Sequence, residues 1–95
     1  MRRICKTDSN QQEIVTALRK LGAVVLLIHQ LKNCFDCLVC FKGKIFMVEI
    51  KDGKLPPSAR KLTQGELDFK AKVESVNCKY WVVESIEDAI KMLNS

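Results

Sequence analysis

A short turn between two apolar runs constrains the fold of this chain more than any other feature of its sequence. Lys42-Gly43-Lys44 separates residues 35–41 from residues 44–51, and both runs are rich in the β-branched and aromatic residues typical of strands. Two such runs joined by a tight turn predict an antiparallel β-hairpin. The first half of the second run is apolar on both faces, so we expect this strand to lie inside a sheet.

The length of the hairpin loop decides which charged residues face each other. A two-residue loop at residues 42–43 would place Asp36 opposite Glu49. The alternative loop at residues 43–44 would place Asp36 opposite Lys51. A three-residue loop would turn Asp36 to the other face of the sheet unless a bulge corrected the register.

Helical and strand patterns alternate along the rest of the chain. They predict strands over residues 23–30 and 79–84, and helices over residues 10–21, 63–75 and from a cap at Ser85 onward. The third and fourth strands should be parallel, because a helix crosses between them. The order α-β-β-β-α-β-α predicts one α/β domain over residues 1–95, with a mixed four-stranded sheet flanked by helices and a short C-terminal helix.

Polar residues at the helix ends support these boundaries. Thr63 stands three residues before Glu66, which is the spacing of a capping box. Asn10 and Glu13 have the same spacing at the start of the first helix. Gly22 is expected to end that helix as the residue after the C-cap.

Charge and composition narrow the class of protein. Lys and Arg outnumber Asp and Glu by 16 to 11, and the net charge of +5 favours a polyanionic partner such as nucleic acid. The longest apolar run, residues 23–28, is too short to span a bilayer, and we expect no signal peptide. Five cysteines without a secretory context favour a reducing cytoplasm. We expect no nucleotide cofactor, because the sequence has neither a Gly-x-Gly-x-x-Gly nor a Walker pattern.

Charged residues at the end of the hairpin could carry chemistry. Glu49 and Lys51 are two residues apart in a strand, so they share one face of the sheet, and Asp36 opens the neighbouring strand. Two carboxylates suit Mg²⁺, and a bound Mg²⁺ lowers the pKa of an attacking water. Lys51 could orient that water or neutralise charge on a phosphate. The same residues could instead form an ordinary salt-bridged strand end.

The order of these residues carries a family resemblance. Asp36 followed by Glu49-Ile50-Lys51 on the next strand resembles the Asp…Glu-x-Lys signature of the PD-(D/E)XK nuclease superfamily. Residues 35–39, 48–54 and 62–66 more closely resemble the small VRR-NUC-type nucleases of phages and prophages, and the likeness covers nearly the whole chain. It implies a restriction-endonuclease-like αβββαβ core. It also implies a Mg²⁺-dependent DNA endonuclease, with Mn²⁺ as a substitute and branched or structured DNA as a possible substrate, in the cytoplasm of a bacterial host.

The resemblance assigns roles to the residues that match the motif. Asp36 and Glu49 would ligate the metal together with the main-chain carbonyl of Ile50. Lys51 would act on the water or on the transition state. The implied products carry a 3′-hydroxyl and a 5′-phosphate.

Three further positions relate to the family pattern less directly. Glu13 matches a first-helix glutamate that relatives often use as an additional metal ligand, and a cap partner for Asn10 is the alternative role. Phe35 stands where relatives usually carry Pro. Glu66 stands where they often carry Gln, and we expect it to act as a helix cap rather than as a site residue.

A basic loop follows the motif. Lys54, Arg60 and Lys61 flank two prolines, and Ser58 could donate a hydrogen bond to phosphate, so we expect these four residues to bind the DNA backbone. A solvated basic loop without a ligand is the alternative.

A homodimer is also expected, because two strands are most simply cut by two active sites and relatives are commonly dimeric. Exposed apolar residues of the last helix, such as Met92, are candidates for its interface. The alternative functions are a non-catalytic nucleic-acid-binding module and a subunit of a phage complex that keeps the nuclease fold.

Overall fold

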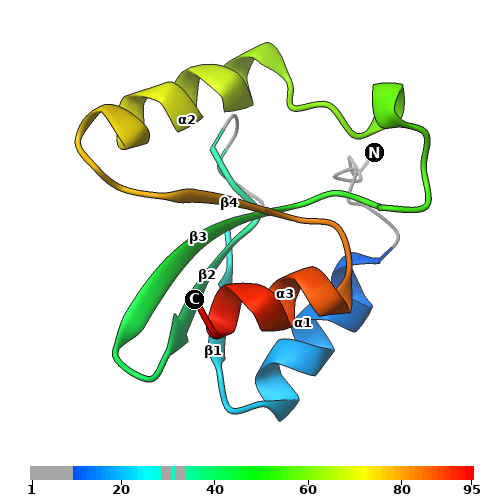
Figure 1. Ribbon diagram of the computed structural model, residues 1–95, viewed down its shortest axis with the longest axis vertical. Coiled ribbons are helices and arrows are strands. Elements are labelled where there is room, and N and C mark those ends of the chain that lie inside the picture. Colours follow the sequence, from blue (N-terminus) through cyan, green and yellow to red (C-terminus); the bar gives the residue numbers. More distant parts are fainter. Residues whose placement is uncertain (1–9, 29–30, 32–33) are drawn as a thin grey trace, which may run out of the picture.

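The computed structural model describes residues 10–28, 31 and 34–95, and it confirms the predicted order of elements (Figure 1). The helices are α1 (Gln11–Lys20), α2 (Gln64–Ser75) and α3 (Ile86–Leu93), and a 3₁₀ turn, η1, covers Pro57–Ala59. The strands are β1 (Val24–Leu27), β2 (Cys37–Phe41), β3 (Lys44–Ile50) and β4 (Tyr80–Val83). β1 is shorter than predicted, and residues 29 and 30 of that prediction lie outside the described residues.

The four strands form one mixed sheet in the order β1-β2-β3-β4. β1, β2 and β3 are antiparallel neighbours, and β4 is parallel to β3 as predicted. The hairpin loop is the two-residue alternative at residues 42–43, since Phe41 pairs with Lys44. Lys42 and Gly43 both have positive φ, at 48° and 80°, as a type I′ turn requires. Continuing this register past Cys37 brings Asp36 level with Glu49.

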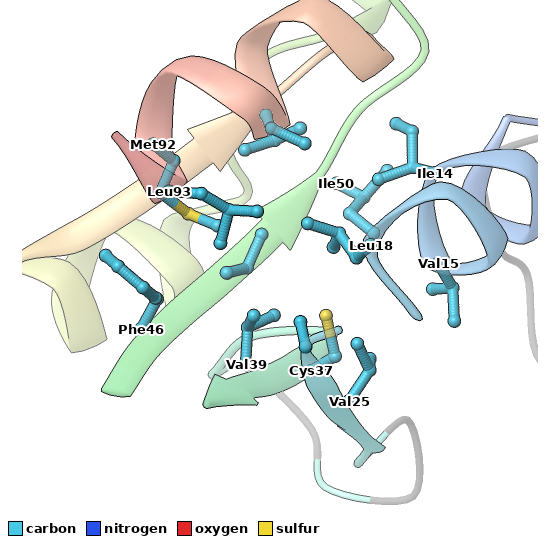
Figure 2. Close-up of a cluster of buried hydrophobic side chains, with 14 residues drawn as sticks. Ile14, Val15, Leu18, Val25, Cys37, Val39, Phe46, Ile50, Met92 and Leu93 are labelled. Atoms are coloured by element: carbon cyan, nitrogen blue, oxygen red, sulfur yellow. The ribbon is translucent and has the colours of Figure 1, made fainter. Parts of the chain in front are cut away.

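The sheet separates two unequal layers. α1 and α3 lie on one side of it and α2 on the other (Figure 1). The core fills the side of α1 and α3, where alternate strand residues meet the apolar faces of both helices (Figure 2). Its largest fully buried side chains are Ile14, Leu18, Val39, Val48, Ile50, Val83 and Met92.

The other layer is thin. None of the residues of α2 is buried. The helix packs on the sheet through Phe69, whose ring centroid lies 5.7 Å from that of Phe35 and 6.2 Å from that of Tyr80. The apolar residues of α2 are therefore only partly covered, since Phe69 and Val73 are half-buried and Leu67 is 45% exposed.

The helix ends confirm three capping predictions and correct a fourth. The Ser85 hydroxyl accepts the main-chain N–H of Asp88 at 3.1 Å, as the predicted cap requires. Thr63 and Glu66 form the complete capping box, and Gly22 follows α1 with a φ of 97°. The predicted box between Asn10 and Glu13 is wrong, because the Asn10 side chain makes no cap hydrogen bond. Its Nδ2 instead donates to the main-chain oxygens of Lys51 at 3.1 Å and Glu84 at 3.2 Å, which ties the start of α1 to the ends of β3 and β4.

Two predictions about surfaces can be compared with the structure. Met92 is fully buried in the core, so its proposed place in a dimer interface is wrong. The apolar side of α3 that carries Met92 packs against the sheet and α1. Among the described residues, no helix is long and apolar enough to cross a membrane.

Candidate active site

Glu49 and Lys51 lie at the end of β3 on the side of the sheet that faces α2. Glu49 is only 4% exposed, and its Oε2 lies 3.3 Å from the Nζ of Lys51. Asp36 immediately precedes β2, where its main-chain N–H donates to the oxygen of Val48 at 2.9 Å. Asp36 Oδ2 accepts a hydrogen bond of 2.7 Å from the main-chain N–H of Ile50. The predicted trio of Asp36, Glu49 and Lys51 thus converges at one end of the sheet.

A third carboxylate reaches the same point from α2. Glu66 Oε1 lies 3.2 Å from Lys51 Nζ, and it also accepts the main-chain N–H of Thr63 at 2.9 Å. The predicted capping role of Glu66 is confirmed, and its contact with Lys51 was not foreseen. The one signal in the sequence was that Glu66 stands where members of the family that the chain resembles often carry Gln.

The three carboxylates perturb one another. Burial, together with the neighbouring Asp36 and Glu66, raises the pKa of Glu49 to about 9, although Lys51 opposes the shift. Glu49 and Glu66 also share a hydrogen bond, in which protonated Glu49 is the donor. Burial would raise the pKa of Glu66, but its hydrogen bonds to Thr63, Glu49 and Lys51 outweigh burial and lower it. Burial and the crowded carboxylates thus favour the protonated form of Glu49, whereas the hydrogen bonds of Glu66 favour its ionised form.

Lys51 is the cation that balances this pair. Burial would lower the pKa of Lys51, but the adjacent Glu49 and Glu66 outweigh burial and raise it. Its side chain therefore stays an ammonium group and donates hydrogen bonds. A charged donor of this kind can contact an anionic oxygen but cannot act as a general base at neutral pH.

The carboxylates of the site also contribute to raised pKa values of two neighbouring side chains, Cys37 and Tyr80. Burial raises the pKa of Cys37 to about 12, and the charges of Asp36 and Glu49 add to that effect. Burial and the carboxylates of Glu49, Glu66 and Asp36 likewise raise the pKa of Tyr80, whose hydroxyl donates to the main-chain oxygen of Cys34 at 2.6 Å. Neither Cys37 nor Tyr80 is ionised at neutral pH, so neither is a nucleophile for this site.

The chemistry of the donors fits a hard divalent cation at Asp36 and Glu49. Both are carboxylates, and the raised pKa of Glu49 reflects crowded negative charge that a cation would relieve. Among the described residues, no group of three or more His, Cys, Asp or Glu side chains is arranged to hold a metal. The two carboxylates would therefore need main-chain oxygen and water to complete a coordination shell.

Glu13 is not brought to this point. It lies exposed on α1 and lines a hollow of about 370 Å³ at the ends of β3 and β4, together with Asp52, Lys54 and Asp88. α1 covers one side of the sheet and α2 covers the other (Figure 1). Glu49 contacts Glu66 of α2, whereas Glu13 belongs to α1.

The basic loop runs from the end of β3 to the start of α2 (Figure 1). Lys54, Ser58 and Lys61 are exposed along it. Arg60 differs from them, because its guanidinium lies 2.8 Å from Glu84 Oε1 and is only partly exposed. Arg60 thus anchors the loop to the end of β4, and Lys54, Ser58 and Lys61 are the loop residues that stay accessible.

Comparisons with models of protein families, with curated proteins and with solved structures found no match to this chain.

The buried proton on Glu49 predicts a pH-dependent gain in stability for Glu49→Gln. The unfolded chain ionises this residue near pH 4.5, whereas the folded chain keeps it protonated up to about pH 9, so wild-type stability falls as the pH rises between these values. Glutamine keeps the shape and cannot ionise. We expect the variant to be more stable than wild type by on the order of 2 kcal/mol at pH 8, with little difference at pH 4.5.

Urea unfolding at a series of pH values measures this difference. Glu74→Gln is the matched control, because Glu74 forms an exposed ion pair with Lys70 on the surface of α2. Parallel stability curves for Glu49→Gln and wild type would show that Glu49 titrates normally in the folded chain.

Proposed function

We propose that this protein is a metal-dependent DNA endonuclease of the PD-(D/E)XK type that hydrolyses phosphodiester bonds. The observation that carries the proposal is the convergence of Asp36, Glu49 and Lys51 at one end of the β2–β3 hairpin. The mixed sheet between helices is compatible with the restriction-endonuclease-like core that the resemblance implies.

Each residue of the trio has a distinct role in this proposal. Asp36 and Glu49 would hold Mg²⁺ or Mn²⁺ with the main-chain carbonyl of Ile50, and the bound ion would lower the pKa of the attacking water. The hydrogen bond from the Ile50 N–H orients the Asp36 carboxylate. Lys51 donates to a non-bridging phosphate oxygen, where it opposes the negative charge that develops as water attacks phosphorus. Glu13 has no role in this shell, because it lines a hollow that neither Asp36 nor Glu49 lines.

The partner and the setting follow from charge and from the cysteines. DNA meets the exposed Lys54, Ser58 and Lys61 of the basic loop, and Arg60 holds that loop in position. Branched or structured DNA is the proposed substrate class. The free thiols of Cys34, Cys37, Cys40 and Cys78 support a reducing bacterial cytoplasm as the setting.

One observation favours a second candidate. The contacts of Lys51 with Glu49 and Glu66 also describe a structural ion-pair cluster that joins α2 to the sheet. A nucleic-acid-binding module without catalysis, or a phage complex subunit, would need no more than that. Cleavage assays separate these possibilities from the nuclease.

Substitutions in the trio should abolish or severely reduce cleavage. Glu49→Gln removes a charged metal ligand, so we expect loss of Mg²⁺ affinity together with loss of cleavage. Lys51→Ala should leave Mg²⁺ affinity nearly intact and lower the cleavage rate by about 10²–10³, since its contribution lies in the transition state. Linear, nicked, flapped and four-way DNA with Mg²⁺ or Mn²⁺ provide the assay.

Lys91→Ala on α3 is the control for this experiment, because Lys91 is exposed and lies outside the site. Wild-type cleavage by Glu49→Gln, after contaminating nucleases are excluded, would remove Glu49 from the site and refute the enzyme assignment.

The contact between Glu66 and Lys51 predicts that Glu66→Gln binds DNA more tightly than wild type. The Glu66 carboxylate pairs with the Lys51 ammonium group, to which a phosphate would otherwise bind. Glutamine at this position removes the charge and still supports the capping box. We expect a gain of about 5-fold in affinity, or about 1 kcal/mol for a partly buried pair. Fluorescence anisotropy in EDTA measures the affinity without cleavage.

Glu74→Gln removes the same charge from the same helix and is the matched control. The gain from Glu66→Gln should disappear when Lys51 is replaced by Met. Equal gains in Glu66→Gln and Glu74→Gln would show that the effect comes from net charge alone. They would contradict a competition between Glu66 and phosphate for Lys51.

Binding should also depend on salt through the basic loop. Removing the charges of Lys54 and Lys61 by Ala substitution should weaken binding and reduce the slope of log K against log salt by about 1.8, from about 0.9 for each phosphate contact. The double variant Lys72→Ala, Lys91→Ala, which loses the same charge from exposed helix positions, is the control. An unchanged slope in the loop variant would exclude this loop from the DNA contact.

A further inference from the structure

The side of the sheet that faces α2 carries an apolar surface that α2 does not cover. Val24 on β1 is 67% exposed, Leu26 on the same strand is 58% exposed, and Ile45 on β3 is 69% exposed. These side chains alternate with buried residues of the core, such as Val25 and Phe46, so they point to the opposite side of the sheet. Exposed residues of this kind gathered on one surface indicate a missing partner.

Strand register brings these residues into two adjacent rows. Val24 pairs with Cys40, which pairs with Ile45. Leu26 pairs with Leu38, which pairs with Met47. We call these six residues the open face. It contains no charged residue, although the chain as a whole carries a net charge of +5.

The size of the open face suits a small protein interface. Three of its six side chains are more than half exposed, and contiguous exposed apolar residues of this kind are typical of an interaction surface. A stable complex buries about 800 Å² on each partner, of which the apolar centre is one part and a polar rim the rest. Two copies of the open face would supply the apolar centre of such an interface.

The free edge of the sheet is less available for assembly than this face. β1 is the edge strand and has only four residues. The guanidinium of Arg19 donates to the main-chain oxygen of Val25 at 2.9 Å, so it already occupies an acceptor that an added strand would need. Packing face to face leaves this hydrogen bond in place.

We propose that a second copy of this chain covers the open face, and that the two copies pack their open faces together about a two-fold axis. Such an interface is isologous, and a surface without charge can meet its own copy without repulsion between like charges. This inference goes beyond the proposed function, because it rests on exposure and register rather than on cleavage.

The same arrangement brings two sites together. Asp36 lies two residues before Leu38, and Glu49 lies two residues after Met47. Both residues share the face of Leu38 and Met47 at one end of the antiparallel pair, so the site borders the open face. A dimer formed here would hold two active sites at the edge of one interface.

Light scattering of the full chain tests the proposal. We expect wild type to have close to twice the monomer mass of 10.8 kDa at about 100 μM. Ile45→Lys should shift the protein to 10.8 kDa and weaken self-association by at least about 100-fold, because a two-fold interface buries the substituted residue twice. Val76→Lys is the matched control, since Val76 is 68% exposed at the end of α2, outside the open face.

A second measurement avoids dependence on any variant. Dilution of ¹⁵N-labelled wild type should shift the amide signals of residues 24–26, 38–40 and 45–47 and leave those of α3 unchanged. A monomer mass for wild type at 100 μM, or dilution shifts centred on α3, would overturn the proposal. Equal dissociation by Ile45→Lys and Val76→Lys would overturn it as well.

Discussion

The ammonium group of Lys51 is the contact on which the end of the sheet depends. Its Nζ lies 3.3 Å from Glu49 and 3.2 Å from Glu66, so one cation balances carboxylates from a strand and from a helix. None of the residues of α2 is buried, and the ring of Phe69 is its packing contact with the sheet. With so little packing, the position of α2 depends also on the contact between Glu66 and Lys51. Displacing Lys51 therefore loosens a helix as well as a charge pair.

The parts of the fold that could be predicted from sequence are those that near neighbours in the chain decide. Lys42 and Gly43 form a turn whose twist matches that of the flanking strands, and this turn sets the register of β2 against β3. The sequence allowed Asp36 beside Glu49 as one of three loop alternatives, and the structure decides between them because Phe41 pairs with Lys44. The Thr63 capping box was equally predictable, because its partners lie three residues apart.

The failures have a common physical cause, which is competition from distant partners. Asn10 has the spacing of a cap, but its amide bonds main-chain oxygens that lie 41 and 74 residues away in the chain. Met92 belongs to an amphipathic helix whose packed side is chosen by the sheet and α1. The second partner of Glu66 is Lys51, which lies fifteen residues away directly after β3. Only the crossover connection from β3 to β4 places α2 next to it. Local patterns contain none of this information.

Three kinds of positive charge can balance the carboxylates at the end of β3, and they compete for the same oxygens. The ammonium group of Lys51 lies against Glu49, and burial favours a proton on Glu49 by raising its pKa. A divalent cation held by Asp36 and Glu49 would displace that proton, since it binds the ionised carboxylate. Glu66 would then be the anion left to Lys51, and a phosphate would compete with Glu66 rather than with the metal ligands. In the proposed nuclease, the contact between Glu66 and Lys51 would thus set how readily a phosphate replaces the Glu66 carboxylate.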